Sequence, residues 1–126
     1  MTKNNLKSRL LNGETVYGPF CKLQDPSAVE IAALAGFDFV ILDMEHGPLS
    51  IESVQNISRA AKAQNLEVVV RVTENMPASI LRVLDVGVHS IQVPQVSTKE
   101  DAQEVVKSSY FHPQGERLSL IHISEP

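Results

Sequence analysis

The sequence lacks the residues that mark several common classes of protein. Cys21 is the only cysteine among 126 residues, so the chain can form neither an internal disulfide nor a zinc site built from several thiolates. No apolar run approaches the roughly 20 residues that span a bilayer, and the first eleven residues lack the apolar core of a secretory signal. We therefore expect a cytoplasmic protein without membrane contacts.

Positive charge is also scarce. The chain has 11 Lys and Arg against 15 Asp and Glu, which gives a formal net charge of -4. Proteins that bind nucleic acid normally present a basic face that displaces counterions from phosphates, and no Lys/Arg cluster occurs here. We expect no nucleic-acid partner. The 43% of hydrophobic residues is ordinary for a globular protein and sufficient for a core.

Strand-like and helix-like segments alternate along the chain. The expected strands are Val16–Cys21, Phe37–Asp43, Glu67–Val72 and His89–Val93. The expected helices begin at Asp25-Pro26, at Ser50, at Pro77 and at the capping-box pattern Ser97-x-x-Glu100, and they end near Gly36, after Ala61, at Asp85 before Gly87, and near Ser109. The second strand is apolar on both faces, which is typical of parallel sheets covered by helices. The alternation predicts an α/β fold with parallel strands.

Two architectures fit this alternation, a doubly wound sheet and a barrel. Length alone favours the doubly wound sheet, because a complete (β/α)₈ barrel typically takes about 250 residues. A small receiver-type signalling domain is one such alternative. It would place paired acids after the first strand and a phospho-accepting Asp after the third, where this chain has Phe20-Cys21 and Arg71. These residues disfavour the receiver domain and leave both architectures open.

Active sites of parallel α/β folds lie at the carboxyl ends of the strands. The second strand is followed there by Asp43, Glu45 and His46, and Arg71 lies at the end of the third. An imidazole beside a carboxylate can serve as a base, although His46 could also be a solvated loop residue. A guanidinium in a Val-rich strand needs an anion, either a bound carboxylate or an ion pair with Asp43, Glu45 or Asp85. Asp43 could equally cap backbone N–H groups of the loop.

Four motifs in order resemble the HpcH/HpaI aldolase family of the phosphoenolpyruvate/pyruvate barrel group. They are FDFVILDMEHGP, VVVRV, VLDVGVHSIQVPQV and HPQGER, within a resemblance that extends from about Leu10 to Arg117. The resemblance implies a partial (β/α)₈ TIM barrel of about four βα units, with residues 1–117 as the N-terminal half. Residues 118–126 do not continue the family pattern. Leu118 stands where the family has Gly, and LSLIHISEP resembles a translated sequencing adaptor; the alternative is a divergent C-terminus.

The resemblance also implies roles for individual residues. His46 corresponds to the general base, which acts through a water at the aldol hydroxyl, and Asp85 to the carboxylate that pairs with it. Asp43 matches the first residue of the same motif and supports the loop. Arg71 corresponds to the arginine that binds the carboxylate and keto oxygen of pyruvate.

The implied reaction is the cleavage of a 4-hydroxy-2-oxo acid to pyruvate and an aldehyde through an enolate, so the partner is a small 2-oxo acid. The family uses a divalent metal, Mg, Mn or Co, held by a Glu and an Asp that we expect beyond residue 126. The parent enzyme is expected to be a homo-oligomer, and this chain alone to bind no metal stably and to be inactive. The alternatives are a citrate lyase β-like enzyme of the same barrel group and a non-catalytic half-barrel that self-associates.

Overall fold

The structure is a computed structural model, which describes residues 5–111 and 113–117. The His112 end of the HPQGER loop and the segment 118–126 lie outside the described residues. The elements in chain order are α1 (Leu6–Leu11), β1 (Phe20–Cys21), α2 (Ser27–Leu34), β2 (Phe39–Asp43), α3 (Ile51–Ala63), β3 (Glu67–Arg71), α4 (Pro77–Asp85), β4 (Ser90–Gln92) and α5 (Lys99–Ser109).

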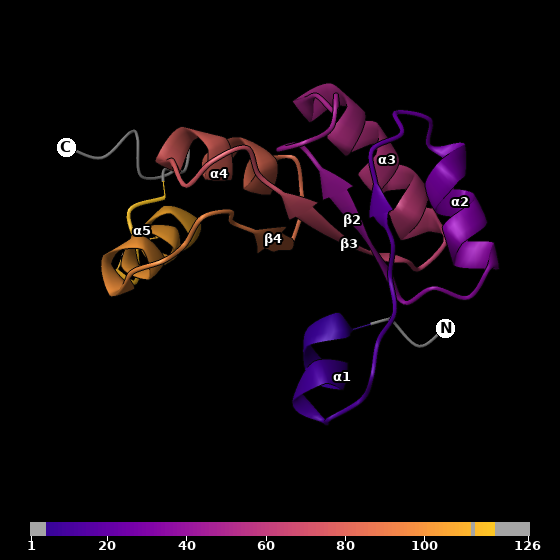
Figure 1. Cartoon of the computed structure of the whole chain (residues 1–126), viewed down its shortest axis with the longest axis horizontal. Coiled ribbons are helices and arrows are strands. Elements are labelled where there is room, and N and C mark those ends of the chain that lie inside the picture. Colours follow the sequence, from indigo (N-terminus) through magenta and orange to yellow (C-terminus); the bar gives the residue numbers. More distant parts are fainter. Residues whose placement is uncertain (1–4, 112, 118–126) are drawn as a thin grey trace.

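The four strands form one parallel sheet in the order β1-β2-β3-β4. Each strand therefore lies beside its predecessor in sequence, and the arrowheads of β2 and β3 point to the same edge of the sheet (Figure 1). A doubly wound sheet reverses its strand order at a switch point, and this sheet has none. The expected α/β fold with parallel strands is confirmed, and the sequential order is that of a barrel wall.

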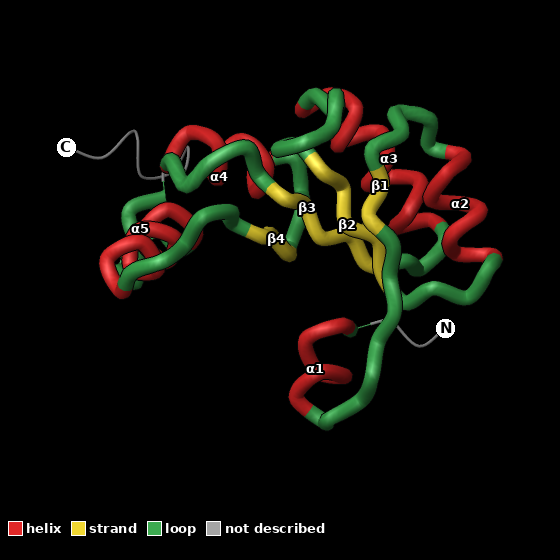
Figure 2. Tube along the Cα trace, in the orientation of Figure 1, coloured by secondary structure: helices red, strands yellow, loops and turns green. Residues whose placement is uncertain are grey.

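The core lies between the sheet and the helices that follow its strands. Alternate residues of the central strands face these helices and are fully buried, as Val40, Leu42 and Val70 show. The helical side contributes apolar residues at helical spacing, among them Val54 and Ile57 of α3. Figure 2 shows α1 set apart from α2 to α5. The sheet thus buries one face under α2 to α4, while α5 packs against α4 (Figure 1).

Several expected element ends are confirmed. α4 has the predicted bounds, Pro77–Asp85, with Pro in its first turn. The side chain of Ser50 caps α3 by accepting a hydrogen bond from the Ser53 N–H at 3.1 Å. Gly36 and Gly87 follow α2 and α4 with φ angles of 93° and 96°, the left-handed region in which glycine ends helices.

The predicted first strand is too long. Val16–Cys21 was expected, whereas β1 pairs only at Phe20 and Cys21. Pro19 has no N–H to give to a ladder, and a Cβ on Gly18 would overlap the carbonyl oxygen of Phe39. The chain therefore approaches β2 too closely to hold a side chain at position 18.

The helix starts near both ends of the chain also differ from prediction. The capping box of α5 is formed by Thr98 and Asp101, one residue after the predicted Ser97 and Glu100. α2 begins at Ser27 rather than at Pro26, although Asp25 still accepts the Ser27 N–H at 2.9 Å. Helix α1, at Leu6–Leu11, was not predicted.

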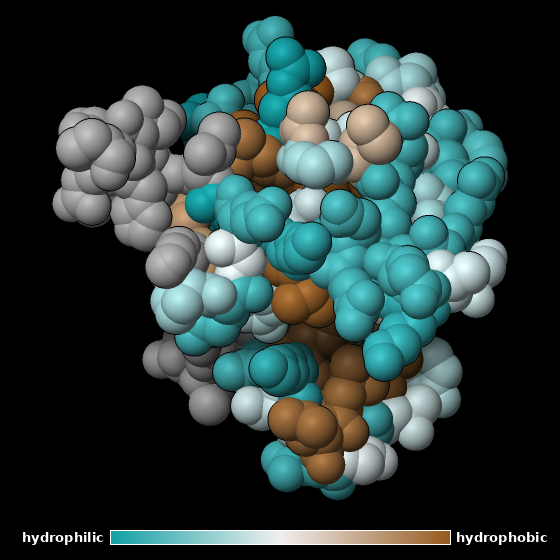
Figure 3. All heavy atoms as spheres, turned by 90° about the vertical axis from the view of Figure 1, so that its left-hand side faces the viewer, coloured by the Kyte–Doolittle hydropathy of each residue, from teal (hydrophilic) through white to brown (hydrophobic). Residues whose placement is uncertain are grey.

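The other face of the sheet is not covered by α2 to α5. The parallel register places Phe20, Ile41 and Val69 in one row on this face, and Phe20 is 52% exposed. Figure 3 views the side of the molecule at which the strands end. A recessed apolar surface lies there above a second apolar patch at the level of α1. Helix α1 carries the exposed residues Leu10 and Leu11. In a barrel this face is the interior.

Within the described part of the chain, no helix has both the length and the apolar character to cross a bilayer.

Candidate functional site

The candidate site lies at the carboxyl edge of the sheet, where β2 and β3 end. Their register pairs Asp43 with Arg71, and Arg71 with Gln92 of β4, so the three side chains share the face that the helices leave open. The loop after β2 carries Glu45 and His46 over the same edge. The structure therefore brings together three of the four predicted site residues, Asp43, His46 and Arg71.

Asp43 is the fully buried acid of this cluster. Its Oδ1 accepts the backbone N–H groups of Glu45 at 3.0 Å and His46 at 3.1 Å, which folds the loop back over the strand end. Its two carboxylate oxygens also receive the guanidinium of Arg71 at 3.0 and 2.6 Å. The hydrogen bonds from Arg71 hold the pKa of Asp43 far below its ordinary value, against the opposing effect of burial. Asp43 is therefore both the loop cap and the ion-pair partner that the sequence left as alternatives.

Arg71 is fixed in orientation on two sides. Its Nε and Nη2 bind Asp43 in the bidentate geometry that suits a guanidinium. The plane of the guanidinium lies over the ring of Phe20, 4.9 Å from the centroid. Nη1 makes no hydrogen bond or ion pair among the described residues, so its two N–H groups remain available at the open face of the sheet. The Arg71 side chain is 19% exposed, which leaves this edge accessible.

The tautomer of His46 follows from its contact with Arg71. Nη2 of Arg71 lies 3.1 Å from Nδ1 of His46, and a guanidinium can only donate, so Nδ1 is the acceptor. The proton of the neutral ring is then on Nε2, which lies 3.3 Å from Oε1 of Glu45. A carboxylate in this position stabilises the imidazolium that forms when Nδ1 takes up a proton. The ring is 63% exposed and open to a ligand.

Asp85 is not part of this cluster. It is the last residue of α4, which leads back to the start of β4, so it lies toward the amino edge of the sheet, away from the end of β2. Its carboxylate binds Nη2 of Arg117 at 3.0 Å and is 55% exposed. The expected pairing of His46 with Asp85 is absent from the described contacts, and Glu45 takes that place. A catalytic role for Asp85 stays a prediction.

Two contributors to the site were not singled out from the sequence. Glu45 was noted as an acid near His46 and as one possible ion-pair partner of Arg71, but not as a site residue, although its position beside the histidine was the available signal. Phe20 was noted only as a strand residue, because nothing in the sequence tells that β1 places it under Arg71. Its register partner is Ile41, one row below Asp43.

The described residues do not form a metal site. Within residues 5–111 and 113–117, no group of three or more His, Cys, Asp or Glu side chains is placed to hold a metal ion. Of the two acids near His46, Asp43 binds Arg71 and two backbone N–H groups, and Glu45 lies beside Nε2 of His46 itself. The chemistry available to the described residues is therefore anion binding at Arg71 and proton transfer at His46.

The depressed pKa of Asp43 predicts a pH dependence of stability. Because its folded pKa lies below the ordinary value of 3.8, Asp43 stabilises the fold fully above about that pH and loses this contribution as the pH falls toward the folded pKa. Hydrogen bonds also lower the pKa values of Asp38 and Asp101. We expect the free energy of unfolding in urea to decrease as the pH falls below 4. The decrease should be shallower in Asp43→Asn, and an unchanged slope in that variant would contradict the assignment.

Comparison with known sequences supports the family resemblance. The profile of the HpcH/HpaI aldolase/citrate lyase family matches residues 17–124. The chain is 37% identical over 120 residues to 5-keto-4-deoxy-D-glucarate aldolases of Klebsiella pneumoniae subsp. pneumoniae and Escherichia coli O139:H28; the alignment covers 94% of this chain and 47% of each relative. The chain thus spans about half the length of the curated relatives it matches. The division at residue 117 stays a prediction.

Solved structures agree with this comparison. The citrate synthase SbnG superposes with a TM-score of 0.86 and 39% identity over 96% of this chain and 50% of its own. An HpcH/HpaI aldolase from Desulfitobacterium hafniense superposes with a TM-score of 0.84 and 32% identity, over 90% of this chain and 44% of its own. With its sequential parallel strands, the chain is accordingly about half of a (β/α)₈ barrel, as expected.

Proposed function

Because the chain belongs to the HpcH/HpaI aldolase/citrate lyase family, we propose that the whole protein is a carbon–carbon lyase acting on 4-hydroxy-2-oxo acids. It releases pyruvate and an aldehyde through a pyruvate enolate. The relatives named 5-keto-4-deoxy-D-glucarate aldolase support an oxidised, acidic substrate of this kind. The proposal includes a cytoplasmic homo-oligomer whose partner is the small 2-oxo acid. This chain supplies the anion-binding and base side of the site and does not turn over alone.

The observation that carries the proposal is the free edge of Arg71. Asp43 and Phe20 hold the guanidinium, while Nη1 makes no hydrogen bond or ion pair among the described residues. One N–H of Nη1 and the outer N–H of Nη2, which now contacts His46, form a second fork that matches two oxygens of a 2-oxo acid, so the substrate would replace His46 as the acceptor from Nη2. The negative charge that develops on the keto oxygen during cleavage would then lie beside a fixed cation.

His46 provides the proton transfer in this proposal. The lone pair of the neutral ring is on Nδ1, which accepts from Nη2 of Arg71 and would be released when the substrate takes that N–H. Nδ1 takes the proton of the 4-hydroxyl, directly or through a water. The C3–C4 bond then breaks, the aldehyde leaves, and the electron pair moves into the enolate of pyruvate. Glu45 stabilises the resulting imidazolium through the N–H on Nε2.

The divalent metal implied by the family, Mg, Mn or Co, belongs to the proposal for the whole protein. Because the described residues offer no ligand set for it, no step above passes through a metal. We propose that its ligands come from a part of the whole protein outside residues 1–126.

A second candidate is a citrate lyase β-like reaction of the same barrel group. The similarity to the citrate synthase SbnG favours it, because that protein's name indicates carbon–carbon chemistry on a tricarboxylate. Both reactions would use Arg71 as a carboxylate anchor. Product analysis separates them, since only the aldolase reaction releases pyruvate together with an aldehyde. A half-barrel that only self-associates would release neither.

We expect Arg71→Lys in the whole protein to raise KM for a 4-hydroxy-2-oxo acid about tenfold, because an ammonium cannot reproduce the fork that binds two oxygens. Pyruvate release coupled to lactate dehydrogenase measures the effect. Arg59→Lys, on the exposed part of α3, is the matched control and should leave KM unchanged.

The same assay tests the proposal as a whole. Wild-type whole protein should release pyruvate with an aldehyde in the presence of Mn²⁺, whereas residues 1–126 alone should release none. Absence of pyruvate from every 4-hydroxy-2-oxo acid supplied to the whole protein would overturn the aldolase assignment. Turnover by residues 1–126 alone would overturn the claim that this chain is only one side of the site.

A further inference from the structure

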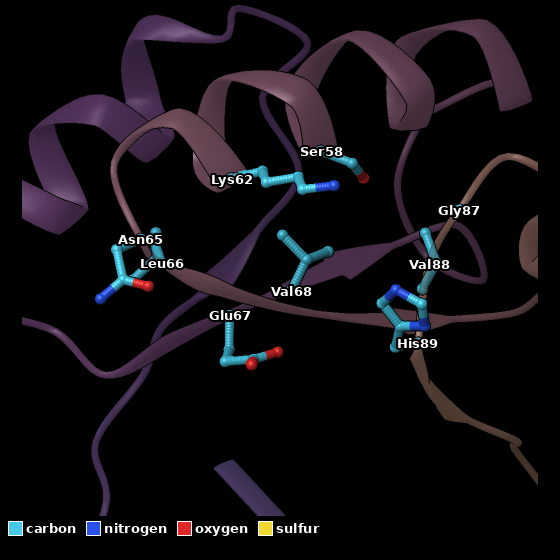
Figure 4. A pocket seen from close by; sticks show the side chains of 9 residues that line it. All are labelled: Ser58, Lys62, Asn65, Leu66, Glu67, Val68, Gly87, Val88 and His89. Carbon is cyan, nitrogen blue, oxygen red and sulfur yellow. The ribbon is translucent and has the colours of Figure 1, made fainter. Parts of the chain in front are cut away.

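A cavity with several polar side chains in its wall lies at the amino edge of the sheet, opposite the candidate active site. It has a volume of about 120 Å³ and lies between α3, the start of β3 and the turn before β4 (Figure 4). One water needs only roughly 10–15 Å³, so the space can hold a small polyatomic ligand. All of its lining residues are described, so the cavity needs no further part of the protein to exist.

Two polar side chains of α3 form the upper wall. Ser58 and Lys62 are four residues apart, so they are neighbours on one helix face, and both extend over β3 in Figure 4. The Oγ of Ser58 is buried and has no hydrogen-bond partner. A buried hydroxyl without a partner is unfavourable and points to a missing ligand or water. The ammonium of Lys62 makes no ion pair with any described residue.

The opposite wall adds a second nitrogen-bearing group. Val69 pairs with Ser90, so the preceding residues Val68 and His89 lie in one row and face the same side of the sheet. That side is the one under α3, where Val68 stands toward Lys62 in Figure 4. His89 therefore borders the cavity from the β4 side, and no described acid forms an ion pair with it. The sequence had suggested no role for His89.

The charged side chain that faces into the cavity is positive. Glu67 also borders it, but its carboxylate extends to the other side of β3, as strand alternation requires (Figure 4). Val68 and Val88 form an apolar floor that limits the access of water. What remains facing the space is an ammonium and an imidazole, with the buried, unpartnered hydroxyl of Ser58 behind the wall.

We propose that this cavity is a binding site for a small oxyanion, a phosphate or a carboxylate, separate from the active site. Lys62 supplies the charge and an N–H of His89 donates a hydrogen bond to the anion, while the hydroxyl of Ser58 would turn out of its buried position to donate another. Asn65, at the turn between α3 and β3, closes the outer side. The site goes beyond the proposed aldolase activity, since none of its residues contributes to the Asp43–Arg71–His46 cluster.

Binding is tested by titrating inorganic phosphate, and separately acetate, into the chain at constant ionic strength kept with NaCl. Backbone amide NMR signals follow the cavity through Ser58, Lys62 and His89, and those of Arg71 report separately on the candidate active site. We expect saturable shifts at the cavity residues. Lys62→Met should weaken the affinity about tenfold, whereas Lys99→Met, which removes the same charge from exposed α5, should leave it unchanged.

The outcomes distinguish the sources of the anion. Saturation by phosphate alone assigns a phosphate site, and saturation by both probes assigns a general oxyanion site. Ser58→Ala is the second variant, because it removes only the buried hydroxyl; it should weaken binding severalfold even if Lys62→Met fails to fold. The proposal is overturned if neither probe saturates, or if Lys62→Met and Lys99→Met have equal effects.

Discussion

Replacement of His46 by Asn in the whole protein is expected to lower kcat for retro-aldol cleavage about 10²–10⁴-fold, the usual contribution of a positioned general base. An amide can still accept the hydrogen bond from Arg71, but it cannot take the proton of the 4-hydroxyl. The His46 side chain is 63% exposed, so the substitution should leave the fold intact. Pyruvate release at saturating substrate measures kcat, and urea unfolding checks that stability is unchanged. A kcat within a few-fold of wild type would exclude His46 as the base.

The companion variants decide which carboxylate assists His46. The structure places Glu45 at 3.3 Å from Nε2, while Asp85 binds Arg117. Glu45→Gln should therefore lower kcat, because the imidazolium that forms on proton transfer loses its anionic neighbour. Asp85→Asn should change neither. The reverse result would support the His46–Asp85 pair that the family resemblance implies. That pair would then have to form in the whole protein through a contact that the described residues do not make.

The fold was largely predictable because its signals are local. Ser50 before an amphipathic run, Pro77 at a helix start and glycines after helices each act within one turn of backbone, so the sequence identifies them. Strand lengths depend instead on pairing with another segment. β1 is short because Gly18-Pro19 passes close to β2, a contact between residues about 20 positions apart in sequence, which no local pattern reveals.

The candidate site was predictable to the same extent. Asp43, His46 and Arg71 follow from one rule, that side chains at the carboxyl ends of parallel strands converge. Their partners do not follow from it. Asp43 and Arg71 pair because the register of β2 and β3 aligns them. Phe20 lies under Arg71 because β1 pairs it with Ile41, two residues before Asp43 on the same face of the sheet. The sequence therefore identified the members of the cluster and left open which acid binds Arg71.

Replacement of Asp43 by Ala is expected to lower the free energy of unfolding of this chain by about 2–4 kcal/mol, out of the 5–15 kcal/mol typical of a domain. Breaking a buried ion pair costs about 3–5 kcal/mol because the remaining charge is left without a partner. The value is reduced here because Arg71 is 19% exposed and can reach water. Two backbone N–H groups of the loop also lose their acceptor. Urea unfolding at neutral pH measures the loss.

Asp85→Ala is the matched control for this prediction. It also removes an aspartate bound to an arginine of similar exposure, 16% for Arg117, but the Asp85 side chain is itself 55% exposed. Because water screens that carboxylate, the loss should be about 1 kcal/mol. If burial determines the strength of the Asp43–Arg71 pair, Asp43→Ala should lower the free energy of unfolding clearly more than Asp85→Ala does. Equal losses would mean that Asp43 is hydrated in solution, and the guanidinium of Arg71 would then lack the fixed orientation on which anion binding at its free edge depends.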